Sequence, residues 1–126
     1  MSGRYLFDTN AIVYYLQGHS GWVSWIDNTK MTERFASVIT RMELLSFHGI
    51  SKDEEDRINR FLDDVIVVAF DENIENTAIA MRRAARLKLP DAIVAATSVT
   101  LEATLITGDQ HLKDLDWPGF HVLMAE

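Results

Sequence analysis

The chain has 126 residues, of which 48% are hydrophobic, and its formal net charge is −7 at pH 7. The length fits one domain spanning residues 1–126, and the absence of cysteine excludes disulfides, thiolate zinc sites and cysteine nucleophiles. The acidic balance argues against a protein that grips nucleic acid over a broad basic face, although it leaves room for one that binds phosphate through a metal ion.

Apolar stretches are short throughout the chain. None reaches the roughly 18 residues of a transmembrane helix, so no membrane contact is expected. The apolar run after Arg4 is too short for a signal peptide, and the expected location is therefore the cytoplasm. The four histidines show no H-x-x-x-H spacing, so oxygen atoms are the expected ligands of any metal ion.

The first half of the chain predicts strands that alternate with helices. Strands are expected at 4–7 and 35–38, and helices at 11–16, from residue 20 or 21 onward, and at 40–47. Thr40 and Glu43 have capping-box spacing at the start of the 40–47 helix. Ser51 and Glu54 repeat that spacing before an amphipathic helix with apolar residues at 58, 61, 62 and 65.

The second half continues this alternation. It predicts strands at 65–70, 104–107 and 120–123, and helices at about 73–88 and from about residue 91. Leu89 and Pro90 break the chain between the two helices, and the second helix has small residues that would let it approach a neighbour closely. Strands alternating with helices predict an α/β sandwich with a mostly parallel sheet.

Four acidic residues stand out by their position. Asp8 follows a strand, Glu43 lies one turn into a helix, Asp91 starts a helix, and Asp109 follows a strand and a glycine. Strand ends and helix starts share one edge of an open parallel sheet, so the four carboxylates can face one pocket. Each residue also has a simpler explanation, as a helix cap, a capping-box partner, a helix-dipole residue or a turn residue respectively.

Carboxylates gathered in one pocket repel each other and stay ionised only beside a cation. Mg²⁺ suits such a site because it keeps several waters and accepts one or two carboxylates directly. The metal can polarise a phosphoryl oxygen and lower the pKa of bound water, so no side-chain nucleophile is needed. The pattern therefore favours metal-dependent phosphodiester hydrolysis.

Four segments in order resemble PIN-domain ribonucleases, in particular the toxins of VapBC-type toxin–antitoxin pairs. The segments are 5–12, 40–45, 89–97 and 105–109, each of which carries one of the four acids. The resemblance covers nearly the whole chain, and the segment 89–97 is its most recognisable part.

This resemblance implies a three-layer α/β/α domain that cleaves RNA endonucleolytically with Mg²⁺ or Mn²⁺. Its metal ions would be held by these residues: Asp8, Glu43, Asp91 and Asp109. Asn10 and Thr107 match polar positions beside the family's site, where they would support the metal-binding groups; a local cap and a strand-end hydroxyl are the alternatives. Some members have a further acid where this chain has His111, which weakens the case for a second metal ion.

Basic residues precede Asp91. Arg82 and Arg86 are four apart, which places them on one face of the expected helix, and together with Lys88 they could contact RNA phosphates. A solvated helix face is the alternative. The resemblance also implies a cognate antitoxin that inserts a segment near the acidic pocket, and a homodimer.

Three alternatives stay open. A receiver-type signalling domain has a similar length and binds Mg²⁺ at strand ends, but Asp8 has no acidic neighbour to form the expected pair. A catalytically silent PIN fold that only binds proteins would not need the full acidic set. A PIN nuclease acting outside any toxin–antitoxin pair would look the same at this level.

Overall fold

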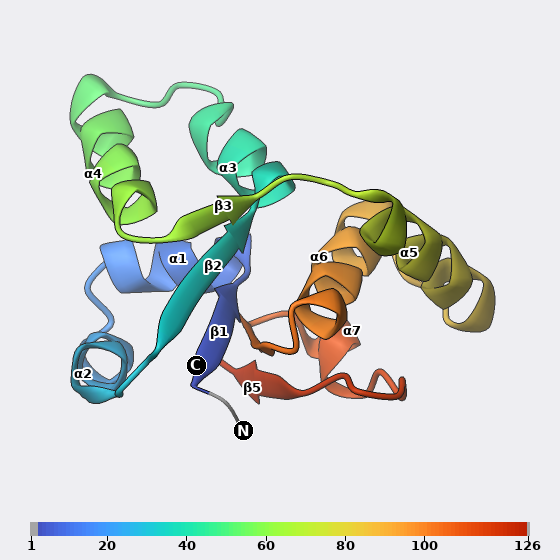
Figure 1. Ribbon diagram of the computed structural model, residues 1–126. Coiled ribbons are helices and arrows are strands. Elements are labelled where there is room, and N and C mark those ends of the chain that lie inside the picture. The colour runs from blue at the N-terminus through green and yellow to red at the C-terminus, as the bar shows by residue number, and fades with distance from the viewer. Residues whose placement is uncertain (1–2, 126) are drawn as a thin grey trace.

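The computed structural model describes residues 3–125 and forms a five-stranded parallel sheet between two groups of helices (Figure 1). The strands are β1 (Arg4–Phe7), β2 (Glu33–Ser37), β3 (Ile66–Val68), β4 (Thr104–Thr107) and β5 (Val122–Met124). The described helices are α1 (Thr9–Leu16), α2 (Ser20–Asn28), α3 (Val38–Leu45), α4 (Lys52–Asp63), α5 (Glu72–Ala84), α6 (Leu89–Thr100) and α7 (Gln110–Lys113). The expected three-layer α/β/α architecture is confirmed.

The strand order is β3-β2-β1-β4-β5, so the first strand lies at the centre of the sheet. Leu6 of β1 pairs with Phe35 of β2 on one side and with Leu105 of β4 on the other. Every strand pair is parallel, so the carboxyl ends of all the strands point to one edge. That edge is where the predicted acidic residues follow their strands.

Alternation along the central strands creates two separate cores. Leu6 and Leu105 belong to a cluster with α5, α6 and α7, whereas Phe7 and Ile106, the next residue of each strand, join α1, α2 and α4 on the opposite face. Figure 1 shows these two groups of helices on either side of the sheet. Because successive side chains of a strand point to opposite faces, short apolar strands suffice to build both cores.

Several helix starts differ from the sequence-based expectation. The helix expected from Thr40 begins at Val38, because the Ser37 hydroxyl accepts a hydrogen bond from the backbone N–H of Ile39 at 3.2 Å. Thr40 is therefore inside the helix and buried, and the capping box expected there was wrong. The Ser51–Glu54 capping box is confirmed, with reciprocal bonds of 3.1 and 3.0 Å.

The second half differs at three boundaries. Helix α5 ends at Ala84, four residues before the expected end, so Arg86 and Lys88 lie in the loop that follows. Helix α6 begins at Leu89 and includes Pro90, since a proline in the first turn gives up no intrahelical hydrogen bond. The last strand is shifted to Val122–Met124, and the short helix α7 was not expected.

In the described part of the chain, no helix has the length and apolar character needed to cross a membrane.

Candidate active site

Asp8 lies where β1 passes into α1, and it is buried. It is the N-cap of α1: its Oδ1 accepts a hydrogen bond of 2.8 Å from the backbone N–H of Thr9. Its Oδ2 accepts a second bond of 2.7 Å from the hydroxyl of Thr107, at the end of β4. Both carboxylate oxygens are therefore fixed, one by the next residue and one by a strand 99 positions later.

Burial raises the pKa of the Asp8 carboxyl above its ordinary value of 3.8. The negative charges of Glu43 and Asp109 raise it further, while the hydrogen bonds from Thr107 and Thr9 act in the opposite direction. Asp8 thus does cap its helix, as the simpler explanation holds, and it also lies within electrostatic reach of two other candidate acids.

Glu43 of α3 is exposed and turned toward the start of α1. Its Oε1 accepts a hydrogen bond of 2.6 Å from the Thr9 hydroxyl, which lies 3.3 Å from the hydroxyl of the buried Thr40. Glu43 is therefore not the capping partner of Thr40, since Ser37 caps α3. The contact joins two segments 34 residues apart, and sequence reasoning missed the part that Thr9 plays in it.

Asp91 and Asp109 form the other half of the edge. Asp91 lies in the first turn of α6, and Asp109 is the N-cap of α7, where its Oδ1 accepts a bond of 2.9 Å from the backbone N–H of His111. The pKa of Asp91 is raised from 3.8 to about 6 by its burial, by the charges of Asp109 and Asp8, and by a hydrogen bond with Asp109. The nearby cation of Lys88 offsets this rise in part.

Asn10 and Thr107 hold the loop that carries Asp109. The Asn10 side-chain oxygen accepts a bond of 2.7 Å from the backbone N–H of Gly108, and the Thr107 hydroxyl accepts one of 3.0 Å from the backbone N–H of Asp109. Gly108 has no room for a side chain, because a Cβ there would lie 2.8 Å from Cε2 of Tyr14. Three contacts therefore fix this loop against α1 and β4.

Other candidates lie apart from this acidic edge. His111 is exposed on α7, and its described contact with Asp109 uses its backbone rather than its imidazole. Arg82 is on α5, but Arg86 is beyond the end of that helix, so the shared helical face expected for the two was wrong. The Nε of Arg82 donates to the carbonyl of Leu87 at 3.2 Å.

The donors at the edge suit a hard divalent cation, because they are carboxylate oxygens whose mutual repulsion adds to burial in raising the pKa of Asp8 and of Asp91. Among residues 3–125, no three Asp, Glu or His side chains stand close enough together to bind one ion directly. Mg²⁺ needs only one or two direct carboxylates with waters for the rest, so these residues fit that ion in chemistry and number.

The fold and this edge define an α/β domain with a carboxylate-lined site at the ends of its parallel strands. The family model described as PIN domain matches residues 5–118. The chain belongs to the PIN-domain family. The resemblance drawn from the four acidic segments is thereby confirmed at the level of the family.

Solved structures of toxin–antitoxin systems share this fold. The chain superposes on VapBC2 from Rickettsia felis, bound to a promoter DNA fragment, with a TM-score of 0.80, 18% identity and 98% and 99% of the two chains covered. A toxin–antitoxin complex from Klebsiella pneumoniae superposes with a TM-score of 0.79 and 27% identity, covering 94% of this chain and 95% of that one. VapBC-5 from Mycobacterium tuberculosis superposes with a TM-score of 0.70 and 16% identity, covering 98% of this chain and 99% of that one. Comparison with curated proteins yields no significant match.

The receiver-type alternative is wrong. Its open sheet has the strand order 2-1-3-4-5, with the third strand beside the first. Here β1 lies between β2 and β4, and β3 is at the edge of the sheet beyond β2. Together with the family match, this order excludes a signalling domain of that class.

Proposed function

We propose that this protein is a metal-dependent endoribonuclease and the toxin of a type II toxin–antitoxin pair. The observation that carries the proposal is the gathering of acids from separate segments at one edge: burial, together with the charges of Asp109 and Asp8, raises the pKa of Asp91 to about 6. A cluster of carboxylates is costly unless a cation compensates it, so the fold maintains a destabilising arrangement. Membership of the PIN-domain family and the likeness to toxin–antitoxin structures support the same conclusion.

The residues proposed to hold Mg²⁺ or Mn²⁺ are Asp8, Glu43, Asp91 and Asp109. When bound, such an ion polarises a phosphoryl oxygen and makes a bound water acidic enough to supply hydroxide near neutral pH. In that role these acids must be ionised, so a bound cation must offset the raised pKa of Asp8 and that of Asp91, which is about 6.

Neighbouring groups position these acids. Thr107 fixes one oxygen of Asp8 and supports the backbone of Asp109, while Asn10 holds the intervening loop through Gly108. The hydroxyl of Thr9, the first residue of α1, donates to Glu43 of α3 and so orients its carboxylate. We assign Asn10 and Thr107 to positioning, since each contacts the acids or their loop and neither has a separate charge to offer a substrate.

A cognate antitoxin and a second copy of the chain are the proposed protein partners. The acidic edge would attract a basic side chain of an inserted antitoxin segment. Large exposed apolar side chains of α3, of the turn after it and of the edge strand β3 offer surface for self-association: Met42, Phe47 and Ile66 are 61%, 66% and 51% exposed. If a small protein co-purified with this chain from the native host as a stable complex, that result would favour the toxin over a PIN nuclease that acts alone.

The test uses purified protein, free of antitoxin, incubated with total RNA from its host in Mg²⁺ or Mn²⁺, with new RNA ends mapped by sequencing. We expect discrete cuts that disappear in EDTA and in Asp91→Asn. Asp53→Asn is the matched control, because Asp53 is an exposed acid on α4, away from this edge, and it should cut as the wild type does.

Two results would overturn the proposal. Cuts of equal intensity from Asp91→Asn would show that the carboxylate cluster is not the site. No cuts in any metal from folded protein would leave a catalytically silent PIN fold that acts by binding other proteins.

A further inference from the structure

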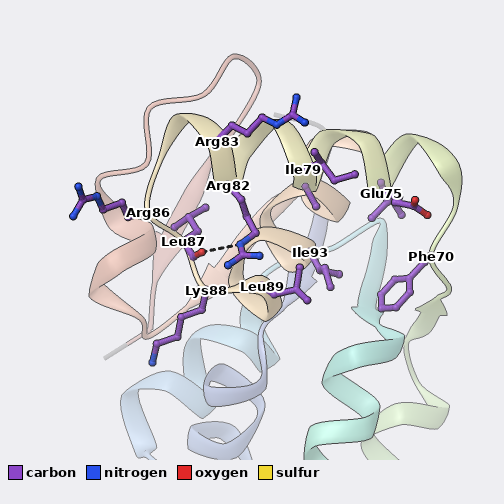
Figure 2. Close-up of a pocket in the computed structure, with 12 residues that line it drawn as sticks. Phe70, Glu75, Ile79, Arg82, Arg83, Arg86, Leu87, Lys88, Leu89 and Ile93 are labelled. Carbon is purple, nitrogen blue, oxygen red and sulfur yellow. Dashed lines mark hydrogen bonds between the residues drawn. The ribbon is translucent and has the colours of Figure 1, made fainter.

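A groove of about 760 Å³ runs between α5 and the start of α6, and none of the candidate acids lines it (Figure 2). Its floor is apolar and comes from buried residues of α5 such as Ile74 and Ala78. Larger apolar side chains remain open to solvent at its margins: Phe70, Ile79 and Leu89 are 49%, 45% and 52% exposed. Folding leaves this surface uncovered, although apolar area is costly to expose.

The rim of the groove is basic. It is formed by Arg82, Arg83, Arg86 and Lys88, which are four of the chain's 12 basic residues. Among the described residues that line the groove, Glu75 is the one acid. A third of the positive charge of an acidic protein is thus concentrated on a stretch of seven residues.

The cations of the rim form no described ion pair within the protein. The described ion pairs involve Arg4 and Lys52, and within residues 3–125 none involves the rim. Figure 2 shows Arg83, Arg86 and Lys88 extending outward, while Arg82 folds back toward the carbonyl of Leu87. In a chain with 19 acidic residues, cations that pair with none of them are available to an anionic ligand.

The groove adjoins the acidic edge. Lys88 and Leu89 line it, and Asp91 follows two residues later in the first turn of α6. The charge of Lys88 reaches the Asp91 carboxyl, whose pKa it lowers. Lys88 therefore links the two regions, because it lines the groove and its charge acts on the Asp91 carboxyl.

We propose that this groove binds the single-stranded RNA that flanks the scissile phosphate. Backbone phosphates would lie against Arg83, Arg86 and Lys88, with a base packed on the exposed ring of Phe70. A basic groove combined with apolar or aromatic platforms is how single strands are bound without strict sequence preference. The inference rests on the proposed nuclease function and adds the path of its substrate.

A polyanion fits the groove better than a second copy of this chain does. In a symmetric dimer closed on this face, each copy would present the same four cations to the other, and like charges would meet. Charged residues are also depleted from the buried centre of protein interfaces. An acidic protein partner is the remaining competitor, and the experiment separates it from RNA.

The first measurement is binding of a fluorescein-labelled single-stranded RNA of about 20 nucleotides, followed by anisotropy in EDTA so that no cleavage occurs. The groove variant is Arg83→Glu with Arg86→Glu. The matched control is Lys30→Glu with Arg60→Glu, which makes the same change in charge at exposed residues outside the groove. We expect the groove variant to raise Kd by more than about tenfold and to reduce the salt slope by about 1.4, the value for two lost phosphate contacts on a single strand.

A second variant tests the apolar platform. Phe70→Ala removes a half-exposed ring, and we expect a Kd raised by about fivefold or more with an unchanged salt slope, because base stacking carries no counterion release. The control variant should stay within about twofold of the wild type once its effect on overall charge is included.

Cleavage kinetics separate a failure of this inference from a failure of the proposed function. The groove variant should cleave a long RNA with a raised KM, whereas the control Lys30→Glu with Arg60→Glu should cleave it as the wild type does. If the wild type cleaves RNA and the groove variant binds and cleaves like the control, the path over α5 and α6 is wrong. Unchanged RNA affinity with an altered sedimentation coefficient would assign the groove to a protein partner instead.

Discussion

The acidic edge and the basic groove, which lie on either side of the first turn of α6, differ in how strongly their charged side chains are restrained. On the acidic edge, every described side-chain hydrogen bond of Asp8 and Glu43 restrains a carboxylate oxygen, with lengths of 2.6 to 2.8 Å. In the basic groove, Arg83, Arg86 and Lys88 extend outward and, among residues 3–125, form no ion pair. The acids are held in place before any ligand arrives, whereas no described ion pair restrains these three cations.

This contrast matches the ligands proposed for the two regions, a divalent cation at the acidic edge and RNA in the groove. An ion bound by carboxylates demands a fixed geometry, since misplacement by a fraction of an ångström loses the ligand. A flexible strand of phosphates can be met by long side chains that adjust to it. Substitutions on the acidic edge should therefore change the rate of reaction, and substitutions in the groove should change affinity.

The largest effect should come from Asp8→Asn. The amide is isosteric: its oxygen can still cap α1, while its NH2 group would donate to the Thr107 hydroxyl instead of accepting from it, so the fold should persist while one negative charge is lost. We expect kcat/KM for a defined RNA to fall by more than about 100-fold, beyond the range for groups that merely support a metal ligand. Circular dichroism would establish that the variant is folded, and a loss below about fivefold would remove Asp8 from the site.

Next in size is Thr9→Val, which removes the hydroxyl that orients Glu43 and keeps the shape of the side chain. We expect kcat to fall by about 10- to 100-fold with little change in KM, because the substrate does not contact this hydroxyl. Thr9→Ser restores the hydroxyl and should recover most of the rate. Equal rates for the valine and serine variants would show that the Thr9–Glu43 bond has no role in positioning.

A smaller effect concerns stability and its dependence on pH. The pKa of Asp91 is about 6 in the folded protein against an ordinary value of 3.8, so its protonated form stabilises the fold. This contribution is fully present below about pH 4 and is lost as the pH rises through about 6. Urea unfolding in EDTA should therefore show Asp91→Asn more stable than the wild type by about 1–2 kcal/mol at pH 7.5, allowing for solvent screening, and equal to it at pH 4.

Adding Mg²⁺ sharpens this measurement. The ion should stabilise the wild type at pH 7.5 by binding the native state, and it should stabilise Asp91→Asn less. A wild type that is more stable than the variant at pH 7.5 in EDTA would contradict the unfavourable coupling of the acids.

The smallest effect should be that of Ile79→Ala in the groove. Ile79 is 45% exposed, so its loss should change the free energy of unfolding by less than about 0.5 kcal/mol. Ile74→Ala on the same helix is the control, because Ile74 is 2% exposed and its truncation should cost about 2–5 kcal/mol. A large loss for Ile79 would mean that the groove margin serves packing rather than a ligand.

The sequence was sufficient to predict the sheet and its acidic edge for a physical reason. Apolar strands such as 4–7 and 104–107 end in polar residues, and parallel pairing necessarily brings those ends to one edge. Each carboxylate is placed by its own strand or helix boundary, so no long-range contact had to be known. The three-layer architecture follows from the same alternation.

Helix boundaries and contacts between distant segments of the chain were harder to predict from the sequence. Ser37 and Thr40 both have cap chemistry, and only packing decides that Thr40 is buried and Ser37 begins the helix. Residues 84–88 contain good helix formers and no glycine, so nothing local marks the end of α5 at Ala84. The contact between Thr9 and Glu43 depends on how α1 and α3 are placed, which no local pattern encodes.

The central position of β1 has a consequence for synthesis of the protein. Asp8 is made long before β4, and β1 lacks one of its two sheet neighbours until Thr104–Thr107 of β4 has been translated. Asp109 follows two residues after that strand. A nascent chain therefore lacks both the complete sheet and the last of the four candidate acids until residue 109 has been made, so the proposed active site forms late in the synthesis of this domain.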